Sequence, residues 1–200
     1  MGGTRYTVLV GLLNSTMTDF DAAYPLPKKY RMHEVCGPGA LFFAFSLGAQ
    51  VGGPVLWVRE RWQADRIHPV GFSAFFDARN LLEAAAKDQA EVLGVAEEAL
   101  RSGAVSLVVM ELSKPLGLTA GRRLQLASKE GKTTALAIIF EGMGSNAAET
   151  RWQCAPVFDP NDSTLQQWQL IKNKSGTFGI WNVRWDADTR RIIVVSKAGE

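Results

Sequence analysis

The residues of this chain with the clearest capacity for chemistry form a glycine-rich turn between an expected strand and an expected helix. The segment His33–Ala40 is typical of a short strand that runs into Gly37, Pro38 and Gly39, and a helix of small and apolar residues is expected over Leu41–Gln50. A strand, a glycine-rich turn and a helix in this order are the usual setting of a phosphate-binding loop, because backbone N–H groups at the helix start bind anions. The turn therefore predicts a nucleotide-binding position.

The side chains that a nucleotide hydrolase needs are missing from this turn. A loop of the form Gly-x-x-x-x-Gly-Lys-[Ser/Thr] uses its lysine for the outer phosphates and its hydroxyl for Mg²⁺. Counted from Gly37, the positions of the second glycine, the lysine and the hydroxyl hold Phe42, Phe43 and Ala44. We therefore expect a degenerate and inactive nucleotide site, with no catalysis, no bound metal and no cofactor.

One acidic residue stands where a metal-orienting group is expected. The run Ala104–Met110 is rich in β-branched residues and predicts a central strand with Glu111 at its carboxyl end. Ligands of open α/β sheets bind beyond the carboxyl ends of the strands. Glu111 is therefore assigned to the same degenerate site, as a candidate remnant of a group that positioned a metal ion or a water molecule. A second acid, Glu60, stands between two arginines and is expected to be solvated.

The rest of the sequence predicts the elements that position this turn. Apolar strands alternate with helices, which is the pattern of a parallel sheet covered on both faces. Helices are expected over Asp88–Arg101 and Thr119–Lys129, each capped by its first residue. After Gly142 the pattern changes to alternating segments, which predict an antiparallel meander. The other expected strands are Pro54–Val58, a short one near Asn80–Ala84, Thr133–Phe140, and the meander segments Trp152–Phe158, Trp168–Lys172, Phe178–Trp185 and Ile192–Val195.

Composition excludes several classes of protein. The 200 residues are 46% hydrophobic with a formal net charge of +2, and this charge is too small to predict nucleic-acid binding by itself. Cys36 and Cys154 stand far apart, mostly among apolar neighbours, and are expected to be buried free thiols, with a structural disulfide as the alternative. His33 and His68 have no partners at metal-ligand or catalytic spacing. The sequence has no secretory signal pattern and no apolar run long enough to span a bilayer, so a cytoplasmic location is expected.

Three segments resemble the core of the RecA family. Glu34–Pro38 is similar to its first strand and the Gly-Pro opening of its loop, Leu100–Val109 to its helix-to-strand segment before the Walker B position, and Leu170–Lys174 to its Lys-Asn-Lys strand. The resemblance implies an α/β fold of the RecA-like P-loop NTPase type, with a mostly parallel central sheet flanked by helices and with C-terminal antiparallel strands. We accordingly expect an N-terminal extension or linker over residues 1–30 and a RecA-like domain over residues 31–200.

The departures from RecA make the chain resemble the ImuA family. The loop after Gly37 is short, Met110-Glu111 replaces the expected aspartate, and the helical segment Pro115–Ala127 is similar to that of this SulA-related family of damage-induced mutagenesis. The resemblance implies a non-enzymatic role in SOS translesion DNA synthesis. It implies RecA and the ImuB/error-prone DNA polymerase machinery as partners, with direct DNA binding weak or absent and no membrane contact. A degenerate nucleotide-binding ATPase and a SulA-type cell-division inhibitor remain the alternatives.

Lys172 and Lys174 are the candidate partner-binding residues. Side chains two apart on a strand lie on the same face, so the two ammonium groups are expected together. In the RecA family the matching lysines reach the nucleotide of the neighbouring subunit, so the resemblance implies a similar contact here, with a solvated sheet edge as the alternative. The four tryptophans of the meander are expected in the core or at an interface, with base stacking as the alternative.

Overall fold

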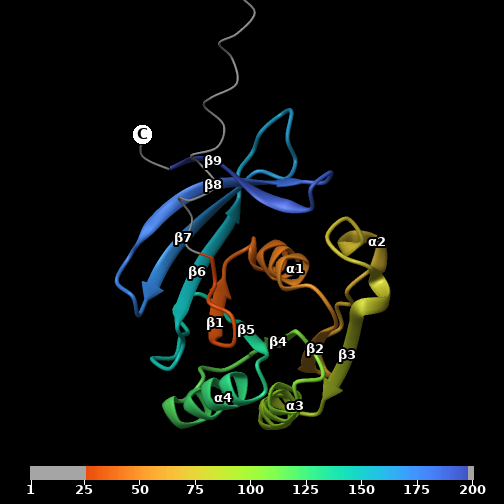
Figure 1. The fold of residues 1–200 in the computed structure, drawn as a ribbon, viewed down its shortest axis with the longest axis vertical. Helices are drawn as coiled ribbons and strands as arrows, with labels where there is room; N and C mark the ends of the chain where they lie inside the picture. The colour runs from red at the N-terminus through yellow and green to blue at the C-terminus, as the bar shows by residue number, and fades with distance from the viewer. Residues whose placement is uncertain (1–25, 198–200) are drawn as a thin grey trace, which may run out of the picture.

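Strands and helices alternate along the first part of the sheet, and strands alone complete it (Figure 1). The computed structural model describes residues 26–197. In chain order the elements are β1 (Met32–Cys36), α1 (Ala40–Val51), β2 (Val55–Glu60), α2 (Pro69–Phe72), the 3₁₀ turn η2 (Ala78–Asn80), β3 (Leu81–Ala86), α3 (Gln89–Ser102), β4 (Leu107–Glu111), α4 (Leu118–Glu130), β5 (Thr134–Ile138), β6 (Thr150–Pro156), β7 (Gln166–Asn173), β8 (Gly179–Asp186) and β9 (Arg191–Lys197).

The strands join in one nine-stranded sheet with the order β3-β2-β4-β5-β1-β6-β7-β8-β9. Parallel pairing runs from β3 to β6, and antiparallel pairing runs from β6 to β9. Strand β6 therefore belongs to both parts, because it pairs in parallel with β1 and antiparallel with β7. This arrangement confirms the predicted α/β class with its C-terminal antiparallel extension.

Helix α1 lies inside the curve of the sheet, whereas α3 and α4 cover the opposite face (Figure 1). The centre of the inner layer is Phe43, which is 1% exposed. Its ring centroid lies 4.7 Å from that of Trp168 and 5.5 Å from that of Trp152. These contacts place α1 against the meander as well as against the parallel strands.

The helix and strand predictions hold with a few differences. Asp88 caps α3 by accepting the Glu91 N–H over 2.9 Å. Strand β3 confirms the short strand near residues 80–84, because pairing with β2 outweighs the helix propensity of this alanine-rich segment. Thr119 as the cap of α4 is wrong, because Gly117 occupies that position and Thr119 lies within the first turn. Of the expected N-terminal extension, residues 1–25 lie outside the described part of the chain.

The position of Phe43 leads to the first prediction. Phe43→Ala removes a fully buried ring and is expected to lower the free energy of unfolding by about 3–5 kcal/mol, the usual cost of this truncation in a core. Urea unfolding followed by circular dichroism measures the change. Phe158, which is 92% exposed, provides a matched control, and Phe158→Ala is expected to change stability by no more than about 0.5 kcal/mol. Equal effects of the two substitutions would contradict the assigned core.

Candidate functional site

The turn between β1 and α1 lies directly against β6. The Gly39 N–H donates to the Cys154 carbonyl over 2.8 Å, and the Ala40 N–H donates to the Gly37 carbonyl over 3.0 Å. Pro38 has no N–H to offer. The N–H groups of Gly39 and Ala40 are thus bonded within the protein, whereas a phosphate-binding loop directs such donors toward its ligand.

Close packing requires both glycines of the turn. Gly37 has a φ of +87°, which favours glycine, and a Cβ at this position would lie 2.5 Å from the Cys154 carbonyl oxygen. A Cβ on Gly39 would lie 2.6 Å from Oε1 of Gln166. Strands β6 and β7 therefore account for the Gly-Pro-Gly pattern that resembles a phosphate-binding sequence.

The residues at the missing Walker positions belong to the core. Phe43 and Ala44 are each 1% exposed. Phe42 is half-buried and makes an edge-to-face contact with Phe75, with 5.3 Å between ring centroids. The side chains at these positions of α1 pack against aromatic neighbours, which gives them a structural role.

A hollow of about 390 Å³ opens beside the turn, at the carboxyl ends of β1, β4 and β5. We call it the acidic hollow, because the residues that line it include two carboxylates and no lysine, arginine or histidine. A polyphosphate would meet like charges here. The lining residues are Gly37, Pro38, Ala40, Leu41, Gln63, Glu111, Leu112, Ile138, Ile139, Phe140 and Glu141.

Glu111 lies at the end of β4, as predicted, and shares the acidic hollow with Gly37 and Pro38. The indole N–H of Trp57 donates to its Oε1 over 2.5 Å. Gly39 belongs to the same turn but packs against β6 and β7. The structure thus brings the predicted nucleotide-site residues together, and the loss of nucleotide binding stays a prediction.

The expectation that Glu60 is solvated is wrong. Glu60 is 6% exposed, and the Trp62 indole N–H donates to its Oε2 over 2.7 Å. The hydroxyl of Ser113 donates to its other oxygen. The neighbouring Arg59 points elsewhere and donates to the carbonyl of Asp65 over 2.5 Å. Glu60 is buried because the loop after β4 covers the end of β2, a contact that sequence spacing does not reveal.

Lys172 and Lys174 lie at the opposite end of the sheet, near the amino ends of β1 and β6. Their Nζ atoms converge on one loop: Lys172 donates to the Ala148 carbonyl, and Lys174 donates to the Ala147 carbonyl over 2.7 Å. Partial burial lowers the pKa of Lys172. The two ammonium groups are thus together. Because β7 is an interior strand, the alternative is wrong in placing them at a sheet edge, but Lys174 is exposed to solvent as that alternative expects.

A buried ion pair holds this loop in place. Glu34 is fully buried, and its Oε2 accepts the Nε–H of Arg151 over 2.8 Å. Its Oε1 accepts the Ser145 N–H over 2.8 Å, and Arg151 also donates to the Ser145 carbonyl over 3.2 Å. A Cβ on Gly144 would overlap the Arg151 guanidinium. Sequence reasoning missed this pair, because its members are 117 positions apart.

A second hollow, of about 580 Å³, lies between α4 and the loop that contacts the lysines. We call it the basic hollow, because four of the residues that line it are cationic: Arg31, Arg122, Lys129 and Lys174. Its one carboxylate, Glu149, is paired with Lys28 over 2.9 Å. The other lining residues are Leu118, Gln125, Leu126, Asn146 and Ala147. The linings of the two hollows therefore carry opposite charge.

The four tryptophans of the meander are core residues, as expected. Trp152, Trp168, Trp181 and Trp185 are 0%, 1%, 3% and 7% exposed, respectively. Rings buried to this extent are not accessible to a nucleic-acid base. The alternative that these tryptophans stack on bases is therefore wrong.

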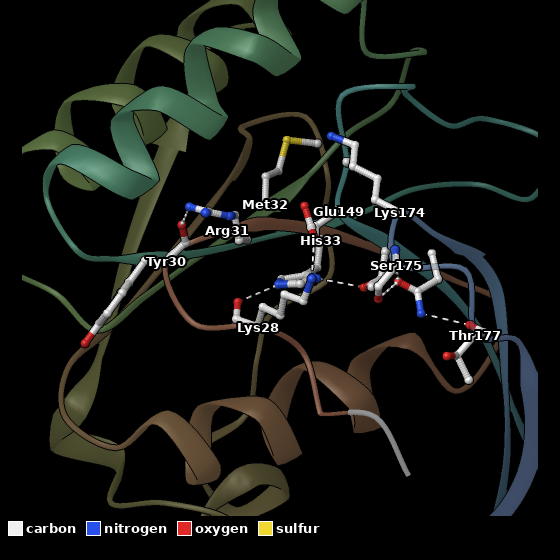
Figure 2. A network of polar contacts seen from close by, with 12 residues as sticks. Lys28, Tyr30, Arg31, Met32, His33, Glu149, Lys174, Ser175 and Thr177 are labelled. Atoms are coloured by element: carbon white, nitrogen blue, oxygen red, sulfur yellow. Dashed lines mark hydrogen bonds and ion pairs between the residues drawn. The ribbon is translucent and has the colours of Figure 1, made fainter.

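His33 anchors the segment before β1 (Figure 2). Its Nε2 lies 2.8 Å from the Lys28 carbonyl, which can only accept, so Nε2 carries the proton and Nδ1 accepts from the Thr150 hydroxyl over 2.7 Å. Burial lowers the pKa of His33 to about 4. Lys28 also forms the ion pair with Glu149, which ties the same segment to the residue before β6.

Cysteines, metal-binding clusters and membrane-spanning helices provide no further candidate site within residues 26–197. Both cysteines are buried and free, and burial raises the pKa of each thiol. Within residues 26–197 there is no cluster of three or more side chains suited to hold a metal ion. None of the helices in the same part of the chain is both long and apolar enough to cross a membrane.

Comparisons with known proteins give a family and a fold. Two curated relatives, both named Protein ImuA and both from strains of Caulobacter vibrioides, are 31% identical to this chain over 144 residues. The matched region covers 70% of this chain and 56% of the relatives, so the chain spans little more than half their length. No family model matches.

A solved structure, the crystal structure of the RadB recombinase, matches with a TM-score of 0.62 and 14% identity, over 84% of this chain and 92% of that one. This match confirms the RecA-like fold.

The environment of His33 leads to the second prediction. His33 takes up a proton near pH 6.5 in the unfolded state and only near pH 4 in the folded state. Neutral His33 therefore favours the folded state, and this contribution to the free energy of unfolding is complete above pH 6.5. It is lost as the pH falls toward 4, by about 3 kcal/mol in total. Denaturant titrations between pH 7 and 4 are expected to show this loss, and His33→Gln is expected to remove it. The exposed His68 is the control, and His68→Gln is expected to leave the loss unchanged. A His33→Gln variant with the wild-type pH dependence would refute the assignment.

Proposed function

Because the chain belongs to the ImuA family, we propose that it is a non-catalytic accessory protein of damage-induced (SOS) translesion DNA synthesis and mutagenesis. It acts in the cytoplasm through contacts with a RecA-type recombinase and with the ImuB/error-prone DNA polymerase machinery. The curated relatives are longer than this chain, so these partners and this activity are part of the proposal.

The hydrogen-bonded turn between β1 and α1 is the observation that carries the non-catalytic part of the proposal. The Gly39 N–H is bonded to Cys154, and the acidic hollow beside it has two carboxylates and no lining cation. ATP hydrolysis needs cationic groups that neutralise the phosphates and a position for Mg²⁺. These features support a protein that acts by binding partners.

The lysine end of the sheet supports contact with a nucleotide-loaded neighbour. Lys174 lines the basic hollow together with Arg31, Arg122 and Lys129, and this positive charge suits the phosphates of a bound nucleotide. The Ala147 carbonyl takes one of the three donors that the Lys174 ammonium carries. A heterologous interface extends into a filament only if both of its faces function. A chain with only this face would bind one end of a recombinase filament and stop its extension.

The third prediction concerns nucleotide. Titration of the protein with fluorescent ATP and Mg²⁺ is expected to show a Kd weaker than about 1 mM, which corresponds to a binding free energy of only about −4 kcal/mol. An active RecA recombinase serves as the positive control. Micromolar binding, or any release of phosphate, would contradict the proposal and favour the degenerate ATPase.

The fourth prediction concerns the lysines. The double variant Lys172→Ala, Lys174→Ala is expected to bind RecA filaments, assembled on single-stranded DNA with a non-hydrolysable ATP analogue, at least tenfold more weakly than the wild type. This loss is about 1.4 kcal/mol, the size of one charge-assisted hydrogen bond. Co-sedimentation measures the binding.

The matched control for the lysine variant is Lys87→Ala, Lys114→Ala, which removes two exposed lysines elsewhere. This control is expected to bind as the wild type does. Thermal unfolding verifies that both double variants are folded. Unchanged binding by a folded Lys172→Ala, Lys174→Ala variant would refute the proposed contact.

A further inference from the structure

Several apolar side chains that line the acidic hollow are exposed to solvent in the described part of the chain. Phe140, two residues after β5, is 63% exposed, and Leu41, in the first turn of α1, is 49% exposed. Both line the hollow together with Pro38 and Ile138. Exposed apolar groups gathered around a concavity are typical of a site that binds another molecule.

Two carboxylates lie beside these apolar groups without a cation of their own. Glu111 accepts from the Trp57 indole over 2.5 Å, and Glu141 accepts from the side-chain amide of Gln153 over 3.2 Å. Within residues 26–197 neither carboxylate takes part in an ion pair. The N–H donors are neutral, so they orient the carboxylates and leave the negative charge uncompensated.

The walls of the hollow are held by the fold itself. The turn is bonded to β6 through Gly39 and Cys154, and Glu111 ends a strand in the middle of the sheet. A volume of about 390 Å³ is near the lower limit of the usual range for binding sites, about 300–1,000 Å³. Such a site suits one or two side chains of a peptide and loses little entropy on binding, because it is already formed.

We propose that the acidic hollow binds a short segment of a partner protein that carries a large apolar side chain next to a lysine or arginine. The apolar group contacts Phe140 and Leu41, and the cation pairs with Glu111 or Glu141. A nucleotide or a nucleic acid would bring phosphate against both carboxylates, and an uncharged ligand would leave them unpaired. The site lies at the opposite end of the sheet from Lys172, so it does not depend on the proposed recombinase contact.

Selection from a phage-displayed library of random short peptides, with the full chain as the target, tests this inference. The enriched peptides are expected to carry Phe, Leu or Trp next to Lys or Arg. Fluorescence polarisation with a synthetic peptide of the enriched sequence then measures affinity. Phe140→Ser and Glu141→Gln are each expected to weaken binding at least tenfold. Glu111→Gln, which keeps an oxygen for the Trp57 indole, is expected to weaken it as well.

Matched controls separate the site from general surface effects. Phe158→Ser and Glu98→Gln change exposed residues away from the hollow and are expected to keep the wild-type affinity. The Lys172→Ala, Lys174→Ala variant is also expected to keep it, so failure of the recombinase contact would leave this result unaffected. The inference is overturned if no peptides are enriched, if the enriched peptides lack a cation, or if folded Phe140→Ser binds as the wild type does.

Discussion

Strand β6 lies so close to the β1–α1 turn that the Gly39 N–H bonds to the Cys154 carbonyl, and the rest of the structure follows from this contact. The meander that begins with β6 places Trp152 and Trp168 against Phe43. Only three residues, Gly37, Pro38 and Gly39, separate the end of β1 from the start of α1. Packing against β6 thus fixes the turn, and the acidic hollow beside it remains open.

The two ends of the sheet have become chemically distinct surfaces. At the carboxyl ends of the parallel strands, Glu111 and Glu141 stand beside exposed apolar groups. At the other end, the buried pair of Glu34 and Arg151 holds the loop whose carbonyls bind Lys172 and Lys174. Breaking a buried ion pair typically costs about 3–5 kcal/mol, so this pair strongly favours the observed position of the loop. Two hollows of opposite charge can distinguish two partners by electrostatic complementarity.

Much of the fold could be predicted from the sequence, because hydrophobic periodicity and capping residues act locally. The helix capped by Asp88, the strand that ends at Glu111 and the meander of tryptophans are found as expected. The errors concern tertiary contacts. Glu60 has arginines on both sides in sequence but is covered by the loop that carries Ser113. Thr119 resembles a cap, yet α4 begins one residue before it.

At the candidate site, too, local sequence features could be predicted and tertiary contacts could not. The sequence by itself determined that this turn lacks a phosphate lysine and a metal-binding hydroxyl, since these are facts of residue type and spacing. It also determined the α/β class, because alternating apolar strands and helices can bury their faces in few other ways. Only the tertiary structure decided which groups surround the turn and the two ends of the sheet. It bonded the turn to β6, gathered four cations around one hollow and two carboxylates around another, and buried Glu34 against Arg151. These partners are distant in sequence, and only the packing of the sheet brings them within reach of one another.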